Sequence, residues 1–485
     1  MSTLALTPSP AEARERPTPR AAWLGFLVVL TAAVMDLLDS TIAQTAAPAI
    51  RRSLGGSYAE LEWISAAYTL AMSVTLLLGS RLGDIVGRRR VLLAGITGFT
   101  GASVLCSLAP SPGALIAGRV LQGVVAAIMV PQGFGLIREL FGDDGQQKAF
   151  GVFGPVMGLA AIAGPLVGGG LINLDVLGAG WRAIFLVNVP LGLAAIVAGI
   201  RYLPRLEPVT PEARLDPTSI AMAMIGGVAL VYPLIQGREH GWPAWSFVML
   251  AVGVVILIAF AALQGRRSRG GRAPLVEPSI LRRRPYVAGL AVVTGFIGAM
   301  GGMMIALNVT YQTGLGFTPW ACGLATVAIP VAAIAGSITS SALLPKIGRR
   351  TMHIGIVVMA AGLATADVVL HAAGGGVSAW DLAAPLALTG LGMGMVFVPM
   401  FDVILAGVEP HQLGSASGLL ESIQQLAMSI GIAAVGTVLF DRLGSGHGAA
   451  AFVDAAVHAL PVAIALLGVA WVGVFWLPRH ARGSH

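Results

Sequence analysis

The sequence has 485 residues, of which 56% are hydrophobic and only 11% are charged, and its mean hydropathy is +0.82. A soluble globular protein is about one-quarter charged, so this composition excludes an ordinary soluble protein and indicates a chain that lies mostly within a membrane. The net charge of +7 therefore indicates loops that face anionic lipid rather than a nucleic-acid-binding surface. The two cysteines, Cys106 and Cys322, both fall in apolar segments, so we expect neither a disulfide nor a metal site.

Long apolar segments recur along the whole chain. A helix needs about twenty apolar residues to cross a bilayer, and by that criterion the sequence predicts an all-α integral membrane protein with fourteen transmembrane helices. The predicted spans are roughly residues 23–50, 60–81, 91–109, 113–137, 149–172 and 183–203, then 217–236 and 244–264, then 286–309, 318–344, 351–373, 381–407, 413–440 and 457–477.

These spans divide the chain into six parts. We expect a disordered cytoplasmic tail over residues 1–22, a six-helix bundle over 23–203, two additional helices within 204–265, a basic cytoplasmic linker over 266–285, a second six-helix bundle over 286–477 and a cytoplasmic tail over 478–485. The first twenty residues lack a short apolar core with a small-residue cleavage site, so they do not predict a signal peptide.

The distribution of basic residues predicts the orientation in the membrane. Lys and Arg favour the cytoplasmic side, and a cytoplasmic N-terminus places 24 of the 30 Lys and Arg residues there. Both termini are then cytoplasmic. An internal repeat supports this topology, because residues 80–89 align without gaps with residues 341–350, and both copies lie between the second and third helices of a six-helix block. Two parallel six-helix repeats are typical of secondary transporters.

Charged residues interrupt the apolar pattern at residues 79–90, which read GSRLGDIVGRRR. Gly83 and Gly87 permit a tight turn and close approach of helices, and cytoplasmic anchoring accounts for the arginines. Asp84 contributes little to topology, so two interpretations stay open. It forms either a local structural ion pair or a latch that holds one side of the protein closed.

Two acids lie on one face of the first predicted helix. Asp36 and Asp39 are three residues apart, and Asp39 lies roughly 24 Å along the helix from its start. A carboxylate at that depth is costly when it is charged and unpaired, so it is usually functional. Asp39 is therefore a candidate proton carrier. The alternative is a structural role in which Ser40, Thr41 or Arg119 satisfies the carboxylate.

Three further charged residues could act with these acids. Arg119 cannot readily lose its proton, so it would serve as a fixed counter-charge, unless it extends to the outer membrane interface. Glu421 lies about 12 Å into its predicted helix, which makes it a candidate for binding a proton or a cation. Asp402 lies about 8 Å from the cytoplasmic end of its helix, so we expect it to be interfacial.

Several of these stretches resemble the signatures of one family. The loop signature of the major facilitator superfamily is similar to the pattern Gly79-x-x-Leu82-Gly83-Asp84-x-x-Gly87-Arg88-Arg89. Motifs of its fourteen-helix drug–proton antiporter branch resemble residues 37–50, 118–127, 154–172, 181–192 and 414–440. The sequence departs from the family pattern at Gln44, at Glu421 and at Pro345, which replaces the acid in the second copy of the loop.

The resemblance, taken with the positions above, assigns roles to three groups of residues. Proton coupling and substrate binding would involve Asp36, Asp39, Arg119, Gln122, Glu421 and Asp402. The gating loop would comprise Gly79, Gly83, Asp84, Gly87, Arg88 and Arg89. The antiporter motif, which in the family lies between the two halves, would comprise Gly154, Gly158, Gly164, Pro165, Gly168 and Gly169.

The family implies a proton-coupled antiporter that exports hydrophobic, often cationic, drugs or toxic compounds by alternating access. The alternative is an exporter dedicated to one endogenous metabolite or antibiotic. We expect a hydrophobic small molecule, protons and membrane lipid as partners, no nucleic acid, no cofactor other than the proton gradient, a monomer, and a bacterial plasma-membrane location. An ATP-driven pump is not expected, because the sequence has no phosphate-binding G-x-x-x-x-G-K-S/T loop. An enzyme is not expected, because the eight histidines show no ligand spacing, and the lack of a sizeable soluble domain disfavours a non-transporting sensor.

Overall fold

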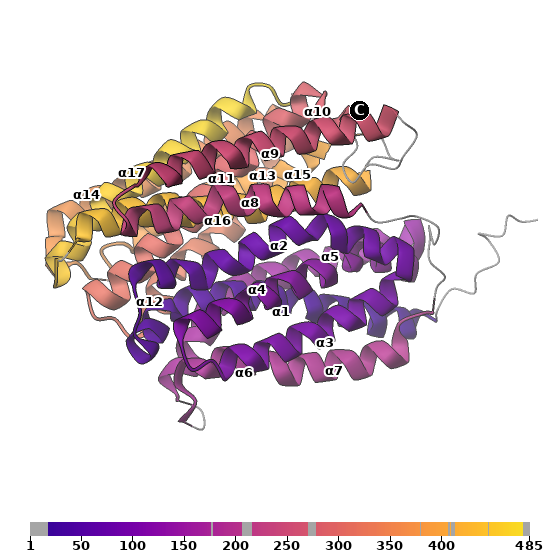
Figure 1. The fold of residues 1–485 in the computed structure, drawn as a ribbon, viewed down its shortest axis with the longest axis horizontal. Helices are drawn as coiled ribbons and strands as arrows, with labels where there is room; N and C mark the ends of the chain where they lie inside the picture. The colour runs from indigo at the N-terminus through magenta and orange to yellow at the C-terminus, as the bar shows by residue number, and fades with distance from the viewer. Residues whose placement is uncertain are drawn as a thin grey trace, which may run out of the picture.

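The computed structural model describes residues 18–175, 178–205, 216–269, 278–378, 380–405, 408, 413–444 and 446–478. Over these residues all regular structure is helical, which is expected in lipid, because a helix satisfies its backbone hydrogen bonds internally. Figure 1 shows long helices that lie roughly parallel, with the first half of the chain beside the second half.

The helices are described in three groups along the chain. The first group comprises α1 (Pro19–Leu54), α2 (Tyr58–Val86), α3 (Arg88–Ser107), α4 (Pro112–Met129), α5 (Gln132–Asn173), the short η2 (Gly180–Arg182), α6 (Ala183–Leu186) and α7 (Asn188–Tyr202). The central pair is α8 (Pro217–Glu239) and α9 (Ala244–Arg269). The last group comprises α10 (Pro278–Leu281), α11 (Arg284–Val309), η3 (Thr310–Gly314), α12 (Pro319–Thr326), α13 (Ala328–Ile347), α14 (Arg350–Ala373), η4 (Gly374–Gly376), α15 (Ala383–Leu405), α16 (Leu413–Leu443) and α17 (Ala449–Val474).

Each predicted span overlaps a helix or a pair of consecutive helices. Within the described residues, eleven helical segments are long and apolar enough to cross a membrane, and a twelfth is counted if the two parts of α2, bent by 48°, form one span. The all-helical membrane fold is therefore confirmed, whereas the number of fourteen crossings stays a prediction.

The region of α4 and α5 differs from the expected pattern. We predict one helix over residues 113–137 and a loop before residue 149, but α4 ends at Met129 and α5 is already helical from Gln132. Pro131 explains the early break, because proline has no backbone N–H to continue the helical hydrogen bonds, although Val130 and Pro131 both keep helical φ and ψ. The change of direction occurs instead at Gly142, whose φ of 65° and ψ of −176° are not helical. The predicted loop is thus a kink.

The two halves meet along several pairs of helices. α2 packs against α16, α5 packs against α12, and α1 contacts both α11 and α12. In the central pair, α8 lies against both α2 and α16, and α9 packs on α8. The central pair therefore borders both halves at once.

One end of the bundle carries the arginine-rich connections, and we call it the basic end. It includes the turn between α2 and α3, the end of α9 and the start of α11, at the right of Figure 1. Arg89 donates a hydrogen bond to the carbonyl of Ile200 at 2.6 Å, and Arg349 donates one to the carbonyl of Phe475 at 2.6 Å. These side chains cap helix C-termini, where a positive charge is favourable.

Candidate functional site

A buried polar network surrounds Asp39 in the first half. The Asp39 carboxylate forms a salt bridge with the Arg119 guanidinium. It also accepts hydrogen bonds from Gln122 Nε2 at 2.8 Å and from Asn188 Nδ2 at 3.0 Å. All four side chains are at most 2% exposed. The carboxylate therefore has one cationic and two neutral donors and is closed off from solvent.

Arg119 has partners on several sides as well. Its Nε donates to the carbonyl of Ile64 at 2.9 Å, and its Nη1 donates to Gln122 Oε1 at 2.8 Å as well as to Asp39. The guanidinium carbon lies 4.2 Å from the centre of the Tyr68 ring. Arg119 is thus buried rather than extended to the membrane surface, and burial of such a pair is tolerable because its donors and acceptors are matched.

The network joins five helices of the first half at one place. Asp39 comes from α1, Ile64 from α2 and Asn188 from α7, while α4 supplies Arg119 and Gln122. α3 takes part through Ser103, whose hydroxyl accepts from Gln122 Nε2 at 3.0 Å and from Asn188 Nδ2 at 3.3 Å. Asn188 lies in the motif over residues 181–192 but is not among the predicted site residues, and neither is Ser103. The signal that could have identified Asn188 is a polar asparagine within an otherwise apolar helix.

The hydroxyls beside Asp39 have other roles. Ser40 and Thr41 each donate to the carbonyl of Leu37, at 2.9 Å in both cases. They satisfy the helix backbone. Arg119, rather than these hydroxyls, therefore balances the charge of Asp39.

Asp36 lies in a different environment from Asp39. It is only partly buried, and it accepts a hydrogen bond from the Tyr68 hydroxyl. Glu421, on α16 of the second half, lies within electrostatic range of Asp36. Two acids from opposite halves are thus brought near each other, about halfway along α1. The side chain of Asp402 lies outside the described residues.

The α2–α16 contact continues from this point towards the end opposite the basic end. Ser422 donates to the carbonyl of Ser73, and the hydroxyls of Thr69 and Ser429 form a hydrogen bond. Beyond them the rings of Tyr58 and Phe440 stack with centroids 4.5 Å apart. We call this row of contacts the α2–α16 seam. It holds the two halves together from mid-depth to the far end.

The predicted gating loop is packed within the first half. Arg88 forms ion pairs with Asp84 at 3.1 Å and with Glu139 of α5 at 3.2 Å. A Cβ at Gly79 would lie 1.9 Å from the carbonyl oxygen of Ala127, so this glycine is required for the close approach of α2 to α4. Gly87 has a φ of 102° and separates α2 from α3. The ion-pair interpretation of Asp84 describes this arrangement, and the latch stays a prediction.

A buried glutamine supports the same loop and is absent from our sequence predictions. Gln132 is 1% exposed, and its amide donates to the carbonyl of Gly79 at 2.8 Å. A Cβ at Gly83 would lie 1.8 Å from Gln132 Oε1. Gly83 therefore leaves room for this side chain.

The glycines of α5 allow close contacts in two directions. Gly164 and Gly168 face Thr41 and Ile42 of α1, where an added Cβ would lie within 2.1 Å and 2.8 Å of side-chain atoms. Gly169 faces the second half, because a Cβ there would lie 2.5 Å from the carbonyl oxygen of Pro319. The packing around Gly154, Gly158 and Pro165 lies outside the described residues. This end of the motif thus lies where the halves meet.

Among the described residues no group of three His, Cys, Asp or Glu side chains could hold a metal ion.

Known proteins resemble this chain over most of its length. The chain is 44% identical over 441 residues to a probable actinorhodin transporter of Streptomyces coelicolor, covering 90% of this chain and 76% of that protein. It is 35% identical to the puromycin resistance protein pur8 of Streptomyces alboniger, covering 95% and 91%. The tetracenomycin C resistance and export protein of Streptomyces glaucescens is 31% identical, with 87% and 77% covered.

Solved structures share the fold at low sequence identity. A POT family peptide transporter, described as auto-inhibited, matches with a TM-score of 0.66 at 17% identity and covers 94% of this chain and 96% of its own. A bacterial homologue of the lysosomal transporter Spinster matches with a TM-score of 0.64 at 13% identity and covers 93% and 95%. The family model described as Major Facilitator Superfamily matches residues 29–432. This chain is a member of the Major Facilitator Superfamily, and it lies in the plasma membrane with many transmembrane helices.

Proposed function

We propose that this protein exports a hydrophobic small molecule from the cytoplasm in exchange for protons. The observation that carries the proposal is the position of Asp36 and Glu421. These two acids, one from each half, lie near each other at mid-depth. A site between two halves that rock against each other can be exposed to either side in turn. Relatives named as exporters and resistance proteins support the outward direction.

The two acids of α1 have different parts in this mechanism. Protonation of Asp39 would leave the buried Arg119 cation without its partner, which is costly. Asp36 accepts from a neutral tyrosine hydroxyl, so it can take up a proton without exposing an unpaired buried charge. We therefore assign proton exchange to Asp36 and Glu421. Asp39 with Arg119 keeps the first half rigid.

The conformation fits one step of alternating access. The α2–α16 seam closes the end opposite the basic end. Basic loops favour the cytoplasm, so the closed end faces outside. Opening towards the outside would require the seam to separate. Proton uptake from outside and substrate release belong to that other state.

A proton-flux measurement tests the proposal. Proteoliposomes with the reconstituted full chain receive lipophilic cations and neutral antibiotics, and the lumenal pH is followed. We expect substrate-dependent proton movement in the parent and at least a tenfold loss, about 1.4 kcal/mol in barrier terms, in Asp36→Asn and Glu421→Gln. Asp454→Asn, which neutralises a 64% exposed acid, is the matched control. Normal flux in both acid variants would refute the assignment, and its loss in Asp39→Asn alone would return the proton to Asp39.

A narrower substrate range is the second candidate. The names of the relatives attach each of them to one antibiotic: actinorhodin, puromycin or tetracenomycin C. A dedicated exporter would move protons with one class of antibiotic and with none of the lipophilic cations. A response to many unrelated cations would favour the multidrug function.

A further inference from the structure

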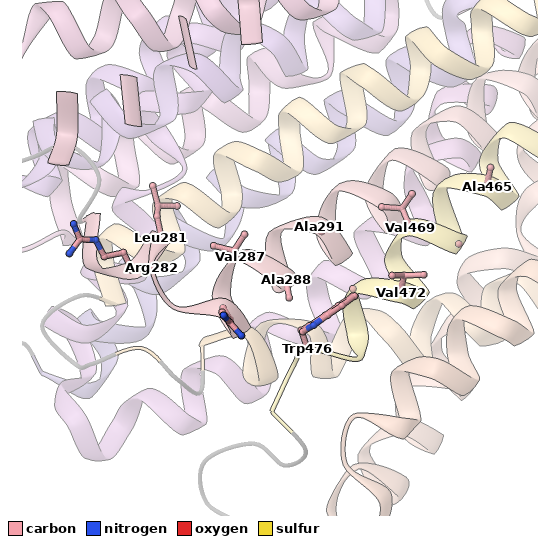
Figure 2. Close-up of a pocket in the computed structure, with 12 residues that line it drawn as sticks. Leu281, Arg282, Val287, Ala288, Ala291, Ala465, Val469, Val472 and Trp476 are labelled. Carbon is pink, nitrogen blue, oxygen red and sulfur yellow. The ribbon is translucent and has the colours of Figure 1, made fainter. Parts of the chain in front are cut away.

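A groove lies on the surface of the second half at the basic end, between α11 and α17 (Figure 2). It has a volume of about 910 Å³, and Leu281 of α10 closes its end. Its walls are apolar, and Val287, Val469 and Val472 are between 44% and 51% exposed. On a chain that spans a membrane, such an exposed apolar helix surface faces lipid.

Small residues create the groove. Ala288 and Ala291 line it on α11, and Ala465 and Gly468 line it on α17. A Cβ at Gly468 would meet no atom within 4 Å, so this glycine leaves open space rather than allowing close helix packing. Ala465 and Trp476 are eleven residues apart, which corresponds to about 16 Å at the helical rise of 1.5 Å per residue. That length is about half of the 30 Å hydrocarbon core of a bilayer, which corresponds to one leaflet.

The basic end of the groove is positively charged. Arg282 and Arg284 both line it and are exposed, and Figure 2 shows Arg282 beside Leu281 at this end. Neither arginine forms an ion pair with another described residue. Trp476, 57% exposed, lies at the same end, as is typical of the membrane–water interface. Cytoplasmic anchoring explains the arginines but not a leaflet-deep apolar groove beneath them.

We propose that this groove is a binding site for one anionic phospholipid of the cytoplasmic leaflet. The phosphate headgroup binds Arg282 and Arg284, and an acyl chain lies along the small residues of α11 and α17. Basic pockets between transmembrane helices on the cytoplasmic side bind such headgroups in other proteins. The proposal does not depend on the transport function.

A lipid in this place would connect parts of the chain that otherwise have few contacts. α10, which carries Leu281 into the groove, touches α9 of the central pair and α11 of the second half. The lipid headgroup would bind the arginines that follow α10. It would thereby fasten the connection after the central pair to the second half.

Native mass spectrometry of the purified full chain tests the site. The protein is mixed with phosphatidylglycerol or with phosphatidylcholine of the same acyl chains, and bound lipid is counted. We expect the parent to retain phosphatidylglycerol preferentially, and the double variant Arg282→Gln/Arg284→Gln to bind it at least about tenfold more weakly. The matched control is Arg201→Gln/Arg205→Gln, which removes two exposed arginines of the first half at the same end.

A second variant tests the apolar part of the groove. Gly468→Phe fills part of the open space, where an added Cβ would meet no atom within 4 Å, and Gly468→Leu is a smaller substitution for the same purpose. Both should displace the lipid while the unfolding temperature in detergent stays near that of the parent. Binding of phosphatidylcholine equal to that of phosphatidylglycerol, or unchanged binding in the arginine variant, would overturn the proposal. Unchanged binding in both Gly468 variants would mean that the lipid is held only by the charge of the arginines and not by the apolar groove. Competition by inorganic phosphate alone would assign the site to a free anion.

Discussion

The two halves of this transporter stabilise their interiors in different ways. The first half has a buried ion pair, Asp39–Arg119, at the centre of a network that joins five helices. The described residues of the second half contain no such buried ion pair. Their interior contacts are neutral, for example Cys322 Sγ with Asn308 Oδ1 at 3.2 Å and the Tyr286 hydroxyl with the carbonyl of Ala416 at 2.6 Å.

This difference separates two uses of a buried acid. A carboxylate surrounded by matched donors fixes a set of helices relative to one another, and loss of one partner is severe. A carboxylate at the border between the halves, such as Asp36 or Glu421, can change partners when the halves move. We therefore expect the first half to move as a rigid unit, with the acids proposed for proton exchange at its edge.

The largest expected effect comes from breaking the ion pair. Arg119→Met leaves Asp39 buried without a cation, so we expect a loss of about 3–5 kcal/mol in stability and loss of transport. A thiol-reactive dye measures unfolding directly, because Cys106 and Cys322 are both 0% exposed in the folded protein.

A paired substitution sharpens this prediction. Asp39→Asn/Arg119→Gln removes both charges, so it should recover most of the lost stability. If the double variant recovers transport together with stability, the role of the Asp39–Arg119 pair is purely structural. Arg201→Gln, at an exposed arginine, is the control for loss of one positive charge. Equal stability of Arg119→Met and the parent would contradict the role of the network as an anchor.

The next effect tests why the two copies of the loop differ. At the repeat offset, Gly79 corresponds to Ser340, whose side chain fits and donates to the carbonyl of Met395 at 3.2 Å. A Cβ at Gly79 would instead meet the backbone of Ala127 at 1.9 Å, so Gly79→Ala should cost about 1–3 kcal/mol. Gly101→Ala, with no atom within 4 Å, should gain about 0.5–1 kcal/mol. Equal unfolding temperatures for the two variants would show that α2 and α4 can separate without cost.

A smaller effect on stability is expected at Asp84. Its ion pair with Arg88 is partly exposed, with side chains 29% and 25% accessible, so Asp84→Asn should change stability by only about 0.2–1 kcal/mol. If the loop is a latch, the transport rate falls several-fold although the unfolding temperature hardly changes. Asp441→Asn, at an exposed acid near the other end, is the control. Unchanged transport would leave only the structural ion pair.

The sequence predicted the framework better than the contacts. Apolar length and basic loops were enough to locate the helices, because both are properties of single segments. The partner of Asp39 required knowledge of how α1, α4 and α7 pack, so Asn188 was not singled out although its motif was noted. Gln132 was missed for a similar reason: its function is to hold a neighbouring helix, and nothing in its own segment indicates that. The kink at Gly142 depends on one backbone conformation that many glycines could adopt.

The smallest expected effect concerns the central pair, which belongs to neither half. Asp216, just before α8, forms an ion pair with Arg267 at the end of α9 and accepts a hydrogen bond from the Ser219 hydroxyl. Burial opposes its ionisation, but Ser219 and Arg267 outweigh burial and lower the pKa of Asp216 below its ordinary value of 3.8. Its contribution to stability is therefore complete above that ordinary value and is lost as the pH falls through the lowered pKa.

Asp216→Asn should accordingly lower stability by about 1 kcal/mol or less at neutral pH. The difference from the parent should shrink in acid, where the parent is protonated as well. Tryptophan fluorescence during heating measures this at each pH, since the chain has nine tryptophans, and Asp454→Asn is the surface control. A difference that persists unchanged in acid would mean that the shape of the Asp216 side chain, rather than its charge, holds α8 to α9, and the pair would then resemble the neutral packing of the second half.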